Sequence, residues 1–235
     1  MVSKTRMLSL VQDFNWKEVK QALREKPELV RFRDKKGRNW LHLCCSIDIL
    51  ERKAKAADSI RTAETLLNAG LEINEPASTK GTWKATALWY SIAFGQNLAL
   101  SRYLLKRGSD PNHCLWAAVN RDNAPAIRLL IENGAEDPTS DESSPLLAAI
   151  QWGKFAAAEE LLRLGADPNF QDRKGMTPLH YLLRKGSDKK HVRMLVKHGA
   201  RGDLKDERGA MAGDIMRRKR DSEFRDMAAQ LATGS

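Results

Sequence analysis

The sequence predicts an all-α protein assembled from repeated units, and three observations support this prediction. A glycine-led phrase recurs at a mean spacing near 32 residues, at Gly70, Gly108, Gly134, Gly165 and Gly199. Each of these glycines follows an amphipathic run that ends in paired apolar residues, as expected for a helix closed by a glycine terminator. A second phrase begins with Ser or Thr, which caps a helix, and continues with Pro at the first helical position. Such self-similarity is the signature of a repeat protein.

Composition and charge exclude several other classes. Hydrophobic residues make up 42% of the 235 residues and charged residues 30%, which argues against a disordered or membrane protein. The start of the chain has no apolar signal-peptide core, and no run approaches the roughly 20 apolar residues of a membrane span. Three cysteines exclude a disulfide framework and fit a reducing compartment, so we expect a cytoplasmic protein without a membrane segment.

The formal net charge of +10 is unevenly distributed along the chain. The balance is +6 over residues 1–100, −3 over residues 101–170 and +7 over residues 171–235. A dedicated nucleic-acid binder more often keeps one continuous basic stripe. The pattern therefore weakens a nucleic-acid function without removing it.

Three motifs carry a resemblance to a known family. Asp172-Arg-Lys-Gly175 precedes Thr177-Pro-Leu-His180, Asp34-Lys-Lys-Gly37 precedes Asn39-Trp-Leu-His42, and Gly165-Ala-Asp-Pro-Asn169 closes a repeat. Over roughly residues 7 to 232 the chain resembles an irregular ankyrin-repeat protein with about five to six repeats, capping repeats included. The resemblance implies a solenoid of stacked helix–turn–helix units with short β-hairpin fingers. Each unit is then stabilised only by its neighbours and the ends need caps, so we expect a monomer.

The predicted units form a single domain over residues 1–235. Residues 1–33 read as N-terminal capping helices with a charged outer face, and residues 204–235 as a C-terminal capping repeat. Between them we expect repeats at 34–74, 75–112, 113–138, 139–170 and 171–203.

Three departures from regularity stand out. About ten extra residues around Ile47 to Thr62 are predicted to extend the helices of the first repeat. The finger between Asn74 and Thr86 is four residues longer than the regular one, and the finger between Asn112 and Trp116 is almost absent. Insertions in repeat proteins fall on loops and often at a binding face.

Residue types suited to catalysis are present but form no known catalytic pattern. The sequence has no Gly-rich phosphate loop, no G-x-S-x-G and no metalloprotease helix motif. The resemblance implies that His42 and His180 hydrogen-bond backbone between repeats. The remaining candidates are two histidines that could share a helix face without a third ligand, and three cysteines expected to be buried hydrophobes: His191, His198, Cys44, Cys45 and Cys114. We therefore expect no catalytic residue, no metal, no cofactor and no enzymatic activity.

The resemblance also indicates where a partner would bind. In this fold the hairpin tips and the last two positions of each first helix line the concave face, free of packing duties. The last position contributes Ile47, Phe94, Arg121, Trp152 and Lys185, and the position before it contributes Arg184. Trp and Arg are enriched in interface hot spots, which favours a binding role. The alternative is that Phe94 and Trp152 fold back over the turns before Gly95 and Gly153.

The fingers supply the other candidate contacts. Trp83, with Lys80 and Lys84 beside it, either contacts a partner or packs on the adjacent hairpin. Cationic finger tips suggest an acidic partner, although solvated turn charges would look the same: Lys35, Lys36, Arg38, Arg173 and Lys174.

These observations predict a non-catalytic protein–protein interaction scaffold. Its partner would be another protein with an acidic and apolar segment, bound through the concave face and the fingers. The alternative is nucleic-acid binding through the basic ends, including Arg217-Arg-Lys-Arg220, by release of counterions. An enzyme or cofactor carrier would need a converging pocket, which the sequence does not indicate.

Overall fold

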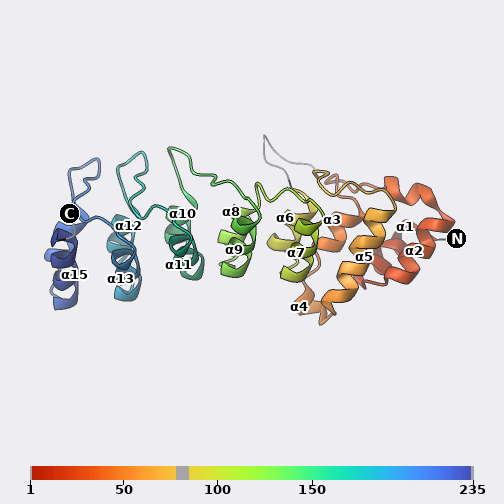
Figure 1. Ribbon diagram of the computed structural model, residues 1–235, viewed down its shortest axis with the longest axis horizontal. Helices are drawn as coiled ribbons and strands as arrows, with labels where there is room; N and C mark the ends of the chain where they lie inside the picture. Colours follow the sequence, from red (N-terminus) through yellow and green to blue (C-terminus); the bar gives the residue numbers. More distant parts are fainter. Residues whose placement is uncertain (1, 78–84, 234–235) are drawn as a thin grey trace. The chain divides into compact units, whose positions relative to one another are not determined.

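The computed structural model describes residues 2–77 and 85–233, and it divides the chain into two compact units. The first unit comprises Met1–Ala117 and Leu129–Glu136, and the second comprises Ala118–Arg128 and Asp137–Ser235. Regular structure in the described residues is helical, as predicted, and Figure 1 gives the helix labels.

The first unit contains the N-terminal helices and the two repeats that follow them. They are α1 (Lys4–Gln12), α2 (Trp16–Glu25), a 3-10 turn (Pro27–Arg31), α3 (Trp40–Cys45), α4 (Ile49–Arg52), α5 (Ala56–Asn68), α6 (Ala87–Ala93) and α7 (Leu98–Lys106). Helix α5 packs against α2, α3 and α7, and α6 packs against α3 and α7. The largest fully buried side chains of this unit include Trp40, Leu66, Leu88 and Leu104.

Two helices, α8 (Leu115–Asn120) and α9 (Ala124–Glu132), are divided between the units. The second unit continues with three helix pairs: α10 (Pro145–Trp152) with α11 (Phe155–Arg163), α12 (Pro178–Lys185) with α13 (Lys189–Lys197), and α14 (Ala212–Arg217) with α15 (Ser222–Thr233). Figure 1 shows the loops before these pairs projecting from one end of each pair. Leu146, Leu147 and Leu179 are buried between neighbouring helices.

The predicted caps begin the first helix of several repeats. The side-chain oxygens of Asn39, Thr86, Ser144 and Thr177 each accept a hydrogen bond from the backbone N–H three residues later. At Asn39 and Thr177 the bond is reciprocated, because the histidine three residues later accepts from the capping residue's backbone N–H. These bonds satisfy amides that would otherwise lack a partner at a helix start.

The structure differs from expectation at the extra residues of the first repeat. They do not extend α3, which ends at Cys45, but form the separate four-residue helix α4 and lengthen α5 to 13 residues. Asp48 caps α4 by accepting hydrogen bonds from the backbone N–H groups of Leu50 and Glu51. A capping residue near the start of the insertion therefore begins a new helix.

The fingers consist mostly of turns and have little of the strand pairing of a β-hairpin. In the described part of the chain, pairing of strand type is limited to two isolated bridges, Ala77 with Ala85 and Lys205 with Met211. The shortened finger is confirmed, because α8 begins one residue after Cys114.

Candidate protein-binding surface

Three residues of the second unit lie at the ends of first helices, and we call them together the helix-end row: Arg121, Trp152 and Lys185. Arg121 directly follows α8, Trp152 is the last residue of α10, and Lys185 is the last residue of α12. All three are exposed. After Trp152 and Lys185 the chain turns through glycines in the left-handed region, Gly153 at φ 69° and Gly186 at φ 64°. These glycines end the helices abruptly and leave the preceding side chain at the corner of the turn.

Two of these helix ends are joined directly. Lys185 donates a hydrogen bond from Nζ to the backbone carbonyl of Gln151, the residue before Trp152. The indole of Trp152 remains at the surface, with 47% of the residue exposed. The fold-back alternative therefore does not withdraw this tryptophan from solvent, and an aromatic surface lies beside a cation.

Phe94, at the corresponding position of the first unit, has different surroundings. Its ring packs on its own helix, with centroids 5.9 Å from Tyr90 and 5.6 Å from Trp89. It keeps 45% exposure. The Phe94 ring thus folds back onto its own helix, as the alternative interpretation has it, but it stays partly exposed to solvent.

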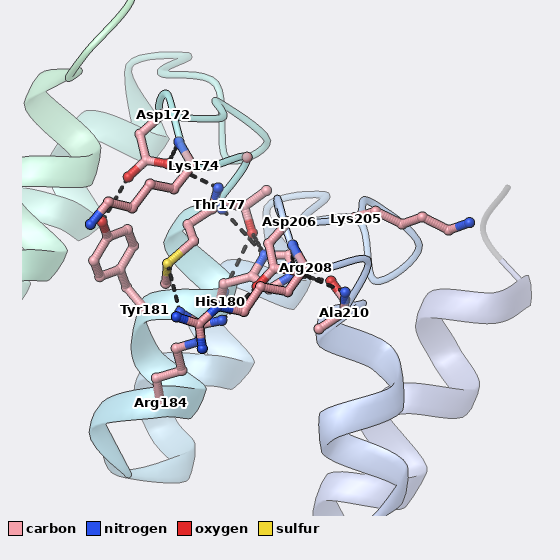
Figure 2. Close-up of polar contacts among 12 residues, drawn as sticks. Asp172, Lys174, Thr177, His180, Tyr181, Arg184, Lys205, Asp206, Arg208 and Ala210 are labelled. Carbon is pink, nitrogen blue, oxygen red and sulfur yellow. Dashed lines mark hydrogen bonds and ion pairs between the residues drawn. The ribbon is translucent and has the colours of Figure 1, made fainter.

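Arg184 is engaged within the fold (Figure 2). Its guanidinium lies 2.5 Å from Oδ2 of Asp206 and also donates to the sulfur of Met176. Asp206 accepts further hydrogen bonds from the backbone N–H groups of Ala210 and Arg208, and these bonds, that of Ala210 first, lower its pKa. Arg184 therefore joins α12 to the next finger, a role that the sequence interpretation as a partner contact did not foresee.

The other predicted finger residues are also placed. Arg38 pairs with Asp34 at 2.7 Å within its own finger, and Arg173 pairs with Glu142 of the preceding finger at 2.5 Å. Lys174 is exposed, and its carbonyl accepts the backbone N–H of Glu207 (Figure 2 draws the finger). Trp83 lies outside the described residues, as do its neighbours Lys80 and Lys84.

The family histidines bridge repeats as the resemblance implied. Nε2 of His42 lies 2.8 Å from the carbonyl oxygen of Glu75, and Nε2 of His180 lies 3.1 Å from that of Ala210. Burial lowers the pKa of His42, so its ring is kept neutral.

The remaining histidines and cysteines form no ligand set. His191 and His198 line one groove between α11 and α13, and His191 stacks on Phe155. The three cysteines are free and buried, and burial raises the pKa of Cys44 and Cys114 to about 12. Within residues 2–77 and 85–233, no three His, Cys, Asp or Glu side chains converge as metal ligands would.

Sequence reasoning missed two features. Glu160 is almost fully buried, yet its pKa is lowered because Arg128 donates to it from α9, with Nε 2.6 Å from Oε1. The second feature is a groove beside α2, lined by Trp16, Lys20 and Arg24. Their spacing of four residues, which places them on one helix face, was the signal that could have found it.

Comparisons with known proteins agree with this geometry. A family model of ankyrin repeats, in three copies, matches residues 114–206. The probable 26S proteasome regulatory subunit p28 of Saccharomyces cerevisiae is 28% identical over 210 residues, which cover 84% of this chain and 87% of the yeast protein.

Two solved structures have the same fold. The ankyrin repeat domain of human ASB11 superposes with a TM-score of 0.72 at 18% identity, covering 97% of this chain and 98% of that domain. The ankyrin repeat domain of Bcl-3, a member of the IκB protein family, gives a TM-score of 0.74 at 20% identity, covering 97% of this chain and all of that domain.

These matches cover the repeats that the glycine and capping phrases delimit. None of the described helices is long and apolar enough to cross a membrane. Ankyrin repeats are in general protein–protein interaction modules and typically lack catalytic activity. The chain therefore has the ankyrin-repeat fold, and its residues 114–206 match the ankyrin-repeat family.

Proposed function

We propose that the chain is a non-catalytic interaction domain that binds a partner protein through the helix-end row of its second unit. The observation that carries this proposal is the half-exposed indole of Trp152 beside Lys185, whose backbone partner Gln151 directly precedes the tryptophan. Large aromatic and Arg side chains at a surface are the residue types that dominate interface energies. The finger residue Lys174 is a second contact of the same unit.

The chemistry of the row favours a partner segment that is both apolar and acidic. Trp152 offers an apolar surface, and Arg121 and Lys185 offer positive charge to carboxylates. Arg184 and Arg38 are held by internal carboxylates, so we assign them to the fold and not to the partner. The yeast relative is named as a regulatory subunit of a larger assembly, which is in keeping with a binding role. We further propose that the domain acts as a monomer, without a cofactor, in the cytoplasm.

The test is a pull-down from nuclease-treated native extract. It compares wild type with the triple variant Arg121→Ala, Trp152→Ala and Lys185→Ala. A matched control, Leu164→Ala with Lys197→Ala, removes one exposed apolar residue and one exposed cation elsewhere in the same unit. We expect a protein captured by wild type and the control to be lost from the triple variant, which should melt like wild type because surface substitutions change stability by only about 0.5 kcal/mol.

Two results would overturn the proposal. Capture that survives the triple variant would remove the row from the interface. Capture that occurs only in a parallel extract without nuclease treatment would move the function to the basic ends, where Arg217 is already paired with Asp214 at 2.7 Å.

A further inference from the structure

The first unit has a groove that takes no part in the proposed function. It has a volume of about 480 Å³ and lies among α2, the Pro27–Arg31 turn and α5. Its apolar lining consists of Trp16, Leu23, Pro27, Val30 and Ala69. Pockets of a few hundred Å³ with mostly apolar walls are typical binding sites, so the groove is large enough to take side chains from a ligand.

The charges around the groove are predominantly positive. Lys20 and Arg24 come from α2, whereas Arg61 and Glu64, the single carboxylate in the lining, come from α5. Lys20 and Arg24 are exposed, and within the described residues neither has an ion-pair partner. The walls of the groove therefore offer positive charge that the fold itself does not neutralise.

The ring of Trp16 lies where the apolar lining of the groove meets its charged residues. Trp16 is half-buried at the first position of α2, and the guanidinium of Arg61 lies 5.7 Å from its ring centroid. The ion pair of Arg61 with Asp58, at 3.7 Å, is long. Tryptophan and arginine are both enriched among the residues that dominate the energy of protein interfaces.

We infer that this groove docks an acidic amphipathic helix of a partner protein. Lys20 and Arg24 are one helical turn apart, so two carboxylates one turn apart on the incoming helix would face them. The apolar stripe of that helix would lie against Trp16 and Leu23, as in other helix-in-groove complexes. A basic helix would be repelled by the same cations. A nucleic-acid backbone would leave the apolar lining uncovered.

The test uses a random-peptide display library selected on the full chain. The bait carries Arg121→Ala, Trp152→Ala and Lys185→Ala, so the recovered peptides cannot depend on the helix-end row. Their affinities are then measured by fluorescence anisotropy on wild type and on Lys20→Glu/Arg24→Glu. The matched control is Lys35→Glu/Lys36→Glu, which reverses two exposed finger charges of the same unit.

We expect peptides with apolar residues at helical spacing and with Asp or Glu one turn apart. Their affinity should fall at least about tenfold on the double reversal, and should not change on the control. Peptides with Lys in place of those acids should bind the double reversal better than wild type, a rescue that a misfolded variant could not give.

Three outcomes would contradict the inference: no acidic class among the selected peptides, equal binding to the double reversal, or no change on Trp16→Ala. Each leaves the proposed function untouched, because the bait lacks the helix-end row.

Discussion

The ends of α6 and α10 carry the same two-residue pattern, an aromatic residue followed by glycine, in different surroundings. Phe94–Gly95 closes α6 in the first unit and Trp152–Gly153 closes α10 in the second. Gly153 adopts the left-handed region at φ 69°, whereas in the first unit that conformation falls one residue later, on Gln96 at φ 47°.

The difference comes from the inserted helix α4. The backbone carbonyl of Gly95 accepts the N–H of Ile49 at 3.1 Å, and Gln96 donates to Asp48 at 2.5 Å. The end of α6 is therefore an attachment point for the insertion. At Gly153 the nearest atom to an added Cβ is 4.0 Å away, so Gly153, unlike Gly95, has no close neighbour at its Cα.

The comparison shows how equivalent positions of a repeat come to have different surroundings. Phe94 shares its helix end with an insertion and packs with two rings of its own helix. Trp152 keeps 47% exposure, and Lys185 is bonded to the residue before it. For this reason the proposed function rests on Trp152.

The largest expected effect is a loss of stability on truncating a buried leucine in α6 or in α10, which tests whether both helices contribute to a core. Leu88→Ala in α6 and Leu146→Ala in α10 remove side chains that are 0% and 1% exposed. Each should lower the free energy of unfolding by about 2–5 kcal/mol, as cavity-forming substitutions do. Urea titrations followed by circular dichroism would measure this. If either variant unfolded like wild type, the assignment of repeat positions would be wrong.

Gly95→Ala is expected to have the next largest effect. An added Cβ would lie 2.4 Å from the carbonyl oxygen of Cys45 and 3.0 Å from that of Ser91, and these backbone atoms cannot rotate away. Overpacking of this kind costs about 1–3 kcal/mol. Thermal unfolding of the variant gives the cost, and an unchanged midpoint would mean that the ends of α3 and α6 are not in contact as described.

Gly153→Ala should cost less, because only the backbone conformation opposes it. A left-handed conformation costs a residue with a Cβ about 1 kcal/mol, and space is available around this position. The same melting experiment applies. A loss of stability equal to or larger than that of Gly95→Ala would show that the ends of α6 and α10 do not differ as described.

The smallest expected effect is a pH dependence of the unfolding free energy, caused by His42 near α6. His42 lies 5.5 Å from the ring of Tyr90 on α6, and burial lowers its pKa. In the unfolded chain a histidine titrates near pH 6.5, so below that pH the unfolded state takes up a proton that the folded state refuses. The contribution of His42 is therefore present above about pH 6.5 and is lost as the pH falls toward its lowered pKa.

The measurement is unfolding free energy against pH for wild type and His42→Gln. We expect a shallower decline in the variant between neutral and mildly acidic pH. Identical slopes would show that the ring is not kept neutral in the folded state.

The parts of the fold that depend on local chemistry were predictable from the sequence. Thr177 with His180 forms a capping box within four residues, and Gly153 and Gly186 terminate their helices next to the residues they affect. Contacts between distant residues were not predictable, apart from those of His42 and His180 that the family resemblance implied. The pair of Arg184 with Asp206 spans 22 residues, and the groove beside α2 needs Arg61 from another repeat.

The insertion illustrates the same limit. Its composition suits a helix, and the sequence does not show whether that helix continues α3 or stands alone. Asp48 as a cap and Gly95 as the acceptor for Ile49 decide for a separate helix. The second of these contacts joins residues 46 apart in the chain, which explains why the expectation failed for α3 although it held for α5.

All three cysteines lie in the first unit, so their reactivity can be used to measure how often that unit opens. Cys44, Cys45 and Cys114 are buried, and the raised pKa of each keeps it protonated and unreactive. A thiol reagent can therefore modify them only when the first unit opens. The rate of that reaction measures opening of the first unit and does not measure opening of the second. A peptide docked beside α2 should slow that reaction, whereas the rate does not report directly on a partner bound at Trp152.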